Sequence, residues 1–295
     1  MLVWEFIRYF RQTIFKDQVQ LVKLRERSIH HSSRVSSGKV HERVSVIVPT
    51  RDKPEMLRKC IQSLRHTIHY SNIELIIVDN DSKDPETKSL LSELALTGAI
   101  VLTYPGRFNY SAICNFASEH ATGSYLCFLN NDTESISLEW LGSMVDHASQ
   151  PGVGIVGAVM LYPDGQLQHM GVALGHNFIA GHPFRGKSAQ SNLPSECFQV
   201  SAVTFACAVV SKETYKDLGG LDESLPSGFN DVDISIRAND AHLENIVCIK
   251  SVLTHHESQT RAKTRSLRGG FRAVLDAIAF LRKHPKKLTD EFFRV

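Results

Sequence analysis

The sequence predicts an α/β fold in which a mixed, mostly parallel sheet carries helices on both faces. Two observations indicate this fold. From residue 44 onward, short apolar runs rich in β-branched residues alternate with segments of helical periodicity, which is typical of βαβ units. Several of the apolar runs also stop abruptly at Asp, Asn or His. Strands that end in this way place polar side chains in the crevice at the carboxyl edge of an open sheet, where ligands bind.

The individual elements follow from the same alternation. Strands are expected at residues 44–48, 74–78, 100–103, 125–129, 154–161, 200–210 and 246–254. Helices are expected at residues 54–66, 85–96 and 109–120, after residue 140 to about residue 148, from about residue 230, and at residues 271–284. The segment 166–196 is rich in Gly, His and Pro. We expect an irregular loop there, and long loops of this kind are often functional.

An amphipathic helix and a linker precede the α/β region. Apolar residues recur at near-helical spacing over residues 1–28 with Arg and Lys between them, and the Ser- and His-rich segment 30–39 is typical of a linker. The helix either packs on a protein surface or lies on an anionic membrane surface. We therefore divide the chain into an N-terminal helix and linker (residues 1–42), an α/β domain (43–262) and a C-terminal helical segment (263–295).

The composition narrows the class of protein. The chain has 295 residues, of which 42% are hydrophobic and 22% charged, so it can form a sizeable core. Its net charge of +2 gives no sign of a nucleic-acid-binding protein. The six cysteines form no CxxC pair and several lie inside apolar runs. We expect them to be buried thiols in a reducing compartment, with neither disulfides nor a zinc site.

The sequence also bears on location. No apolar segment reaches the length of a membrane span. Glu5, Arg8 and Arg11 interrupt the N-terminal region where a signal peptide would be apolar. We therefore expect a cytoplasmic protein, with peripheral contact at the inner face of the cell membrane as an option for the N-terminal helix.

One stretch is more informative than any other: Tyr125-Leu-Cys-Phe-Leu-Asn-Asn-Asp132. A buried-looking apolar run stops there at two amides and a carboxylate. Oxygen ligands of this kind suit a hard cation such as Mg²⁺ or Mn²⁺, which in turn binds phosphates. The alternative is a strand followed by a polar turn, since Asn and Asp are common turn residues.

Polar clusters follow apolar strands or open a helix at four places in the chain. They are Asp79-Asn80, Asn130-Asn131-Asp132, Asn230-Asp231-Val232-Asp233 and His255-His256. Parallel strands bring their carboxyl ends to one edge of a sheet, so we expect these distant residues to converge there. No G-x-G-x-x-G follows the first strand and no G-x-x-x-x-G-K-[ST] loop is present. Neither a dinucleotide oxidoreductase nor a P-loop ATPase is therefore expected.

In their order along the chain, these motifs resemble those of family 2 glycosyltransferases, which have the GT-A fold. The closest resemblance is to rhamnosyltransferase-like enzymes that build bacterial surface polysaccharides, and it covers roughly residues 43–262. The matching stretches are Val44-Ser-Val-Ile-Val-Pro-Thr50, Val78-Asp-Asn-Asp-Ser82, Pro105-Gly-Arg-Phe-Asn-Tyr-Ser111, Phe128-Leu-Asn-Asn-Asp132, Gly219-Gly-Leu-Asp-Glu223, Phe229-Asn-Asp-Val-Asp233 and His255-His-Glu-Ser258. Any one of them is weak evidence, whereas their ordered sequence is specific.

The resemblance implies a binding site for a nucleotide-sugar donor. In the family, the end of the first strand holds the nucleotide and the acidic end of the second strand binds the base. The implied donor-binding residues are Pro49, Thr50, Arg51, Asp79, Asn80, Arg107, Asn109, Ser111, Asn130 and Asn131. Because Asn130-Asn131-Asp132 occupies the place of the Asp-X-Asp motif, Asp132 is the implied ligand of a Mn²⁺ or Mg²⁺ ion on the diphosphate. Asn130 replaces the first Asp of that motif, so the site has one negative charge fewer.

The resemblance also implies a catalytic base and a second metal ligand. Asp231 lies where relatives carry an acidic pair before a helix, so it is the implied general base for the acceptor hydroxyl. Either His255 or His256 corresponds to the late metal-binding histidine, and we favour His255 because it directly continues a strand. The implied acceptor-site or supporting residues are Asn230, Asp233, His256 and Arg261. The histidines of the irregular loop, expected at the surface or the acceptor site, are His169, His176 and His182.

The implied function is inverting, metal-dependent sugar transfer. The donor would be a dTDP- or UDP-sugar, dTDP-rhamnose among them, and the acceptor a hydroxyl of a glycan or lipid-linked saccharide. Two other functions stay open. The amides at Asn130 and Asn230 motivate a non-catalytic nucleotide-sugar-binding module of a larger assembly. A sugar-nucleotide transferase or nucleotide hydrolase would use the same metal site.

Overall fold

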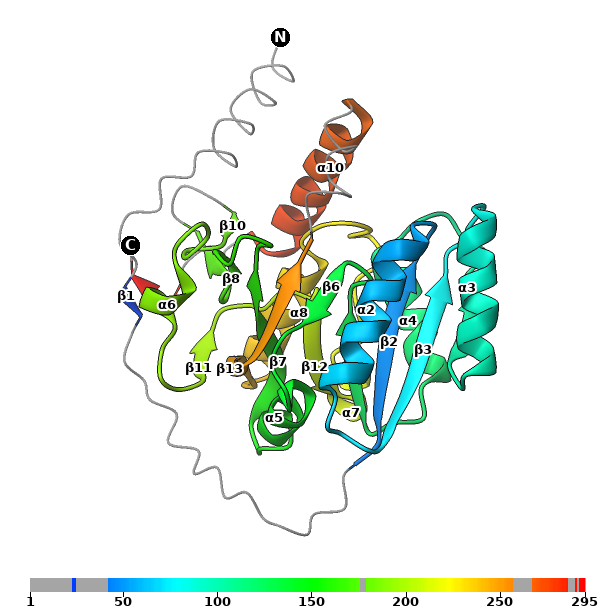
Figure 1. Cartoon of the computed structure of the whole chain (residues 1–295). Coiled ribbons are helices and arrows are strands. Elements are labelled where there is room, and N and C mark those ends of the chain that lie inside the picture. The colour runs from blue at the N-terminus through cyan, green and yellow to red at the C-terminus, as the bar shows by residue number, and fades with distance from the viewer. Residues whose placement is uncertain are drawn as a thin grey trace.

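Figure 1 shows the computed structural model of the chain, which describes residues 23–24, 42–175, 179–256, 267–285, 290 and 292–294. The strands are β1 (Lys23–Leu24), β2 (Val44–Thr50), β3 (Ile73–Asp79), β4 (Ile100–Thr103), β5 (Tyr125–Leu129), β6 (Thr133–Ser135), β7 (Val153–Leu161), β8 (Leu167–His169), β9 (Ala173–Leu174), β10 (Ala180–Gly181), β11 (Phe198–Val200), β12 (Cys207–Ser211), β13 (Glu244–His255) and β14 (Phe293–Arg294). The helices are α2 (Pro54–Thr67), α3 (Pro85–Leu96), α4 (Tyr110–His120), α5 (Trp140–Ala148), α6 (Ala189–Asn192), α7 (Lys212–Asp217), α8 (Asn230–Asp240) and α10 (Leu267–Lys283).

A ten-stranded mixed sheet forms the centre of the described fold. Its strands lie in the order β11-β13-β7-β12-β5-β2-β3-β4, with β6 paired to β13 and β8 paired to β7. The strands β5, β2, β3 and β4 run parallel, as do β7 and β13, whereas β12 is antiparallel to both of its neighbours. As a result, β2, β3, β5, β7 and β13 all have their carboxyl ends at the same edge of the sheet.

Helices cover both faces of this sheet (Figure 1). Along β2, the side chains of Val44, Val46 and Val48 belong to the core beneath α2, α3 and α5. Ile47 belongs instead to the core beneath α4, α7 and α8. All four side chains are fully buried. Successive side chains of a strand point to opposite faces, so a strand covered on both faces reads as the continuous apolar run found here.

A smaller core joins the C-terminal helix α10 to α8. Phe280 of α10 is fully buried and packs in a cluster with Val232 of α8. Close by, the buried carboxylate of Asp233 lies 2.7 Å from Arg237 of its own helix and 2.8 Å from His284, which follows α10. Apolar and ionic contacts together hold α10 against the α/β domain.

A buried carboxylate lies at the opposite, amino edge of the parallel strands. Glu74 of β3 is 6% exposed and accepts hydrogen bonds from the Ser45 hydroxyl and from the backbone N–H groups of Thr122 and Gly123. Arg43 lies 3.3 Å away on the outer side. Burial raises the pKa of Glu74, but the hydrogen bonds from Ser45 and Thr122 and the charge of Arg43 outweigh burial, so the pKa lies below its ordinary value of 4.5.

The expected elements agree with the structure to within a residue or two, with two exceptions. Helix α10 begins at Leu267, four residues before its expected start at residue 271. Residues 200–210 were expected to form a single strand, but they contain the end of β11 and most of β12, which are separated in the sheet by β13 and β7. Residues 201–206 form a loop between them. The apolar pattern was misleading because Val203 and Phe205 are buried in the loop. The loop can be buried because its backbone N–H groups bond to side chains, for example Val203 N–H to Ser235 Oγ at 3.4 Å.

The irregular segment 166–196 carries only short strands and the short helix α6, as expected. The expected N-terminal helix lies outside the described residues except at Lys23–Leu24. There the structure differs from the expectation, because these two residues form β1 and pair antiparallel with β14.

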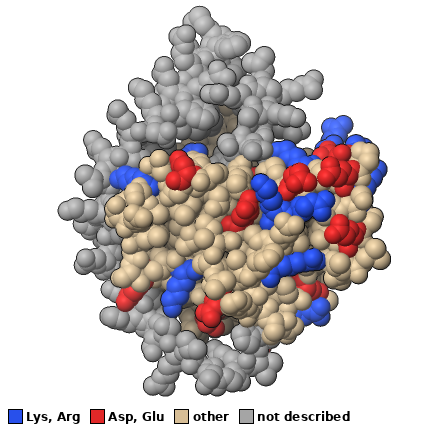
Figure 2. All heavy atoms as spheres, in the orientation of Figure 1, with Lys and Arg blue, Asp and Glu red and all other residues tan. Residues whose placement is uncertain are grey.

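Charges of both signs mix on the face of the molecule shown in Figure 2. Over α2 and α3, Arg58 lies among Glu55, Glu86 and Glu93 at 3.6, 4.0 and 3.8 Å. This mixture agrees with the small net charge of +2 and differs from the one-sign stripe of nucleic-acid-binding proteins. None of the helices in the described part of the chain combines the length and apolar character needed to cross a bilayer.

Candidate active site

The carboxyl edge of the sheet brings together the polar ends of β2, β3 and β5. Thr50 and Asp79 are partners in the β2–β3 ladder, and the Asn80 N–H donates to the Thr50 carbonyl at 2.9 Å. From the segment after β5, the side-chain amide of Asn131 donates to Thr50 Oγ1 at 2.9 Å. Two of the four polar clusters expected to converge, residues 79–80 and 130–132, therefore meet here around Thr50.

Asp132 and His255 meet at the same edge. The segment after β5 crosses to β13 as β6, which places Thr133 opposite His255 in an antiparallel pair. His255 Nε2 then lies 3.1 Å from Asp132 Oδ1, and the two side chains are only 11% and 9% exposed. Burial raises the pKa of Asp132, but the hydrogen bond and charge of His255 outweigh it and hold the pKa below its ordinary range. Asp132 is thus an ionised carboxylate in a buried position.

Gln168 of β8 orients the His255 ring. Its Oε1 lies 2.6 Å from His255 Nδ1, and its Nε2 donates to the His255 carbonyl at 3.2 Å. Because the amide nitrogen is committed to the carbonyl, Oε1 faces the ring and can only accept, so Nδ1 carries a proton. Nε2 is then the ring nitrogen that faces Asp132, where it can donate a proton to the carboxylate or, once that proton is displaced, offer its lone pair to a metal ion. A proton held on Nδ1 is what an imidazole needs in order to bind a metal ion through Nε2.

The neighbouring His256 points elsewhere. Its Nε2 lies 2.8 Å from Oε1 of Glu134 on β6. Of the two histidines between which the sequence left a choice, His255 is therefore the one next to Asp132. Arg261, expected near this site, lies outside the described residues.

A second pair of histidines, His169 and His182, lies close to His255. His169 Nε2 accepts from the Thr204 N–H at 3.3 Å, and its Nδ1 lies 3.0 Å from Nδ1 of His182. Burial, followed by the nearby His182 and His255, lowers the pKa of His169 well below its ordinary value of 6.5. His169 is thus a buried neutral residue, so the surface position, one of its two expected places (the other being the acceptor site), is wrong. His176 lies outside the described residues.

Both residues at the end of β3 are engaged by the protein itself. Asp79 accepts from the backbone N–H of Ser82 at 3.0 Å and from its hydroxyl. Asn80 is 2% exposed and donates to the Gly106 carbonyl at 2.8 Å. Its Oδ1 is buried and has no hydrogen-bond partner among the described residues. An unpaired buried acceptor costs about 1–3 kcal/mol, so this atom is a candidate acceptor for a donor group of a ligand.

The remaining predicted donor-site residues divide into accessible and structural ones. Arg51 and Arg107 are exposed, and Pro49 is half-buried in β2. Asn109 caps α4, where its Oδ1 accepts from a first-turn N–H at 3.1 Å. Ser111 is fully buried and donates to a carbonyl of the loop before α8 at 2.8 Å. Asn109 and Ser111 therefore position α4. The two arginines are the exposed cationic side chains among the residues predicted to bind the donor.

The polar residues of the acidic motif at the start of α8 lie in different surroundings. Asn230 is 6% exposed, and its amide donates to the Ser111 hydroxyl at 3.1 Å. Asp233 is committed to Arg237 of its own helix at 2.7 Å and to His284, which follows α10, at 2.8 Å. Asp231 is half-buried in the first turn, where the helix dipole favours a carboxylate. It lies near Tyr110, whose pKa is raised mainly by burial, with the charge of Asp231 adding to the effect.

The loop 201–206 connects these parts of the site. Its carbonyls accept from the Asn130 N–H at 2.9 Å and from the Tyr110 hydroxyl at 2.9 Å. One of its N–H groups donates to His169. Sequence reasoning missed both this loop and Gln168. The polar Ser201 and Thr204 inside an apolar run were the available signal for the loop, whereas nothing in the sequence distinguished Gln168.

Comparison with known proteins identifies the family. The family described as "Glycosyl transferase family 2" matches residues 45–219. A curated relative, the O-antigen biosynthesis protein RfbC of Myxococcus xanthus, is 38% identical over 224 residues, which make up 74% of this chain and 18% of that protein. The chain belongs to glycosyl transferase family 2. It spans less than a fifth of the length of RfbC.

Solved structures place this family 2 glycosyltransferase in the predicted fold. GalNAc-T7 with UDP, GalNAc and Mn²⁺ matches with a TM-score of 0.63 at 15% identity, covering 74% of this chain and 44% of that one. The mannosyltransferase PcManGT of Pyrobaculum calidifontis with GDP-Man and Mn²⁺ matches with a TM-score of 0.56 at 18% identity, covering 80% and 64%. The fold of this family 2 glycosyltransferase is GT-A.

Proposed function

We propose that the chain is the catalytic domain of an inverting glycosyltransferase. It moves a sugar from a nucleoside diphosphate sugar to a hydroxyl of a growing surface glycan. The proposal is carried above all by Asp132 and His255, which meet at 3.1 Å where the strands end. In an open α/β sheet, this edge is where nucleotides bind. Membership of family 2 supports the same assignment.

The donor set at Asp132 and His255 fits a divalent metal ion. An ionised carboxylate and an imidazole lone pair facing each other at 3.1 Å repel unless a proton or a cation lies between them. Carboxylate oxygen and imidazole nitrogen are both ligands of Mn²⁺, with which the two matching structures were solved. We assign these two side chains as the protein ligands of Mn²⁺ or Mg²⁺. When bound, such an ion offsets the negative charge that develops on the diphosphate leaving group.

The residues around Thr50 form the nucleotide end of the proposed donor site. The unpaired Oδ1 of Asn80 accepts an N–H of the base, and uracil and thymine each offer one. The side chain of Asn130 makes no hydrogen bond within the described part of the chain, and we assign it to the ribose or the sugar. The exposed guanidinium groups of Arg51 and Arg107 are the candidate phosphate contacts.

Asp231 is the proposed general base. Unlike the buried Asp233, it is partly exposed, so the hydroxyl of an acceptor can reach it. Its carboxylate takes the proton of the acceptor hydroxyl while the hydroxyl oxygen bonds to the anomeric carbon of the sugar. The bond from that carbon to the diphosphate oxygen breaks, and the nucleoside diphosphate leaves with the electron pair. One displacement inverts the anomeric configuration without a covalent enzyme intermediate.

The proposed donor is a UDP- or dTDP-sugar, dTDP-rhamnose among them. The proposed acceptor is a glycan or lipid-linked saccharide, which the name of RfbC as an O-antigen biosynthesis protein supports. Membrane contact through the N-terminal helix stays a prediction, because residues 1–22 and 25–41 lie outside the described residues.

A nucleotide titration tests the donor site. The purified chain is mixed with UDP, dTDP, GDP or CDP, each with and without Mn²⁺, and its melting temperature is measured. A ligand that binds only the folded protein raises that temperature. We expect a Mn²⁺-dependent rise with UDP or dTDP that is lost in Asp132→Ala. Asp217→Ala, which removes an exposed carboxylate from α7, is the control and keeps the rise.

Other outcomes of this titration, or of an activity assay with nucleotide sugars, support other functions. No stabilisation by any of the diphosphates contradicts the donor site. Stabilisation without turnover on any glycan acceptor supports a non-catalytic nucleotide-sugar-binding module. Release of a nucleoside monophosphate from the nucleotide sugar, in place of the diphosphate, supports a sugar-nucleotide transferase or a hydrolase.

A further inference from the structure

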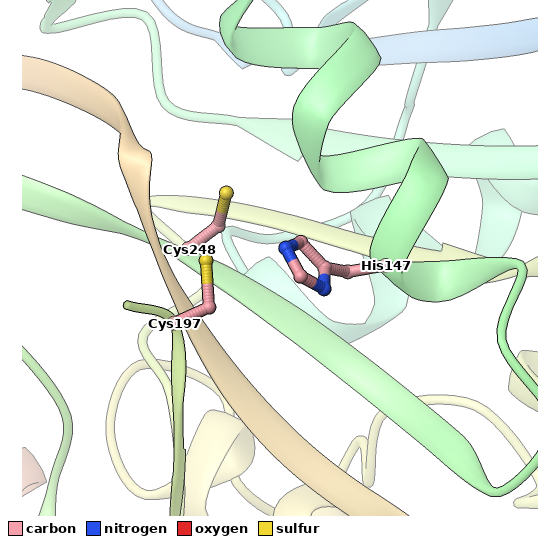
Figure 3. A group of neighbouring side chains, drawn as sticks. All are labelled: His147, Cys197 and Cys248. Atoms are coloured by element: carbon pink, nitrogen blue, oxygen red, sulfur yellow. The ribbon is translucent and has the colours of Figure 1, made fainter. Parts of the chain in front are cut away.

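Three side chains that the proposed reaction does not use meet away from the carboxyl edge. His147, Cys197 and Cys248 each bring one ligand atom to within 4.8 Å of the others. His147 lies in the last turn of α5, Cys197 immediately before β11 and Cys248 within β13. Figure 3 shows the three side chains converging on the space between the helix and the two strands. Within the described ranges, no other three His, Cys, Asp or Glu side chains gather in this way.

Strand pairing and helix packing produce the cluster. Phe198 pairs with Val247 in the antiparallel β11–β13 ladder, so the next residues outward, Cys197 and Cys248, oppose each other. Helix α5 packs against β13 and turns His147 toward them. Cys248 is fully buried, whereas His147 and Cys197 are half-buried. The cluster therefore has one side in the core and another open to solvent.

The two sulfurs and the imidazole already interact. A hydrogen bond from Cys248 lowers the pKa of Cys197 to about 4 against the opposing effect of burial, and His147 adds to the lowering. Bonding to Cys197 and burial together raise the pKa of Cys248 well above its ordinary range. The Ser251 hydroxyl donates to Cys248 Sγ at 3.3 Å. The geometry alone, with the three ligand atoms within 4.8 Å of one another, brings them within reach of a single ion.

We propose that His147, Cys197 and Cys248 bind a zinc ion, with water as the fourth ligand. Two thiolates and an imidazole suit Zn²⁺ and are poor ligands for Mg²⁺ or Mn²⁺. With zinc–ligand bonds of about 2.0–2.3 Å, the ligand atoms of a tetrahedral site lie roughly 3.5–4 Å apart. The spacing of up to 4.8 Å needs only small side-chain rotations to reach this. The solvent-facing side of the cluster supplies the water.

The zinc site is structural and separate from the donor site. Cys248 and His255 lie on the same strand, roughly 20 Å apart along it. The strand β11 is at the edge of the sheet and has only three residues. A zinc ion joins this short strand and the end of α5 to β13. Because the ion binds the folded chain and not the unfolded one, it raises the stability of the protein.

Metal analysis and cobalt substitution test the site. The untagged full chain is prepared without chelator, its zinc content is measured, and the stripped protein is titrated with Co²⁺. We expect about one zinc per chain and a thiolate-to-cobalt charge-transfer band in the near ultraviolet. Both are lost in Cys197→Ser and Cys248→Ser. Cobalt at Asp132 and His255 gives no such band, because that site contains no sulfur.

Two further variants keep the test decisive if a cysteine variant folds poorly. His147→Gln retains both thiols and is expected to lower zinc affinity at least tenfold, roughly the scale of losing one metal-supporting interaction. Cys114→Ser removes a buried cysteine outside the cluster and keeps the zinc and the band.

Three results overturn the proposal. The first is a zinc content in Cys197→Ser equal to that of the unmodified chain. The second is the absence of a thiolate band when the unmodified chain takes up Co²⁺. The third comes from thiol titration under denaturing, non-reducing conditions. Two thiols fewer than the six in the sequence, together with all five remaining thiols free in Cys197→Ser, identify a Cys197–Cys248 disulfide in place of a metal.

Discussion

His255 Nε2 lies 3.1 Å from a carboxylate oxygen of Asp132, although β5, the strand that leads to Asp132, is not a neighbour of β13 in the sheet. Between β5 and β13 the sheet contains β12 and β7. The contact therefore spans the antiparallel strand β12 and joins the parallel block β5-β2-β3-β4 to the parallel pair β7-β13. A metal ion held by these two residues depends on both blocks keeping their relative position.

Replacing His255 tests its proposed role as a metal ligand. In His255→Ala, Asp132 alone remains, so the apparent Mn²⁺ affinity in the presence of UDP or dTDP should fall by more than the roughly 10–100-fold that loss of a supporting interaction causes. The measurement is the Mn²⁺ dependence of the melting temperature. His256→Ala is the matched control, because that ring pairs with Glu134. An equal loss in both variants contradicts the assignment of His255.

Replacing Gln168 tests whether it positions the metal ligand. Gln168→Leu removes the acceptor from His255 Nδ1 and should weaken Mn²⁺ binding about 10–100-fold. Gln168→Glu keeps an acceptor at the same atom and should retain most of the affinity. If Gln168 has a purely structural role, Gln168→Leu lowers the melting temperature but leaves the Mn²⁺ concentration at half-maximal binding unchanged. That result would contradict the positioning role.

Replacing Asp231 tests the proposed base. Asp231→Asn keeps the size of the side chain but cannot take a proton, so sugar transfer should fall by about 10²–10⁴-fold. Mn²⁺-dependent nucleotide binding should stay unchanged, because Asp231 is not a proposed donor contact. The assay is release of nucleoside diphosphate in the presence of acceptor, with Asp217→Asn as control. Near-normal transfer in Asp231→Asn rules out this residue as the base.

Replacing Glu74 tests the buried carboxylate at the amino edge. At neutral pH, Glu74→Gln should lower the free energy of unfolding by about 1–3 kcal/mol, because the amide cannot accept all the bonds that the carboxylate does. The pKa of Glu74 is lowered in the fold, so its contribution is complete above 4.5 and is lost as the pH falls through the folded pKa. Urea unfolding at several pH values measures this.

The difference between the unmodified chain and Glu74→Gln should therefore shrink on acidification. Glu119→Gln, at an exposed position on α4, should change the stability little at any pH. A difference for Glu74→Gln that is independent of pH would show that the charge is not what stabilises this edge.

Sequence patterns were sufficient where local signals agree with tertiary structure. Helix α2 begins at Pro54 and buries one stripe of apolar residues, so its bounds could be read directly. The meeting of Thr50, Asp79 and Asn131 followed from the direction of parallel strands alone. The choice of His255 over His256 followed from the strand continuing to His255. Its ring lies next to Asp132, and its role as a metal ligand stays a prediction.

Sequence patterns were insufficient where the role of a residue depends on contacts between distant segments of the chain. Burial of Val203 and Phe205 produces the same apolar pattern in a loop as in a strand, so the loop 201–206 was hidden. Gln168 acts only through His255, which follows much later in the chain. The cysteines 197 and 248 looked like ordinary buried thiols, because neither the β11–β13 register nor the approach of α5 can be read from their spacing.

The late position of β13 has a consequence during synthesis. The ribosome delivers Asp132 first and His255 afterwards, a delay on the order of ten seconds at typical elongation rates. Until β13 inserts between β7 and β11, the nascent chain holds the edge around Thr50 but lacks the second proposed metal ligand. Under the proposed function, a partly made domain therefore lacks the complete metal site with which it would activate a nucleotide sugar. The proposed metal site is complete only when the last strand of the described central sheet is in place.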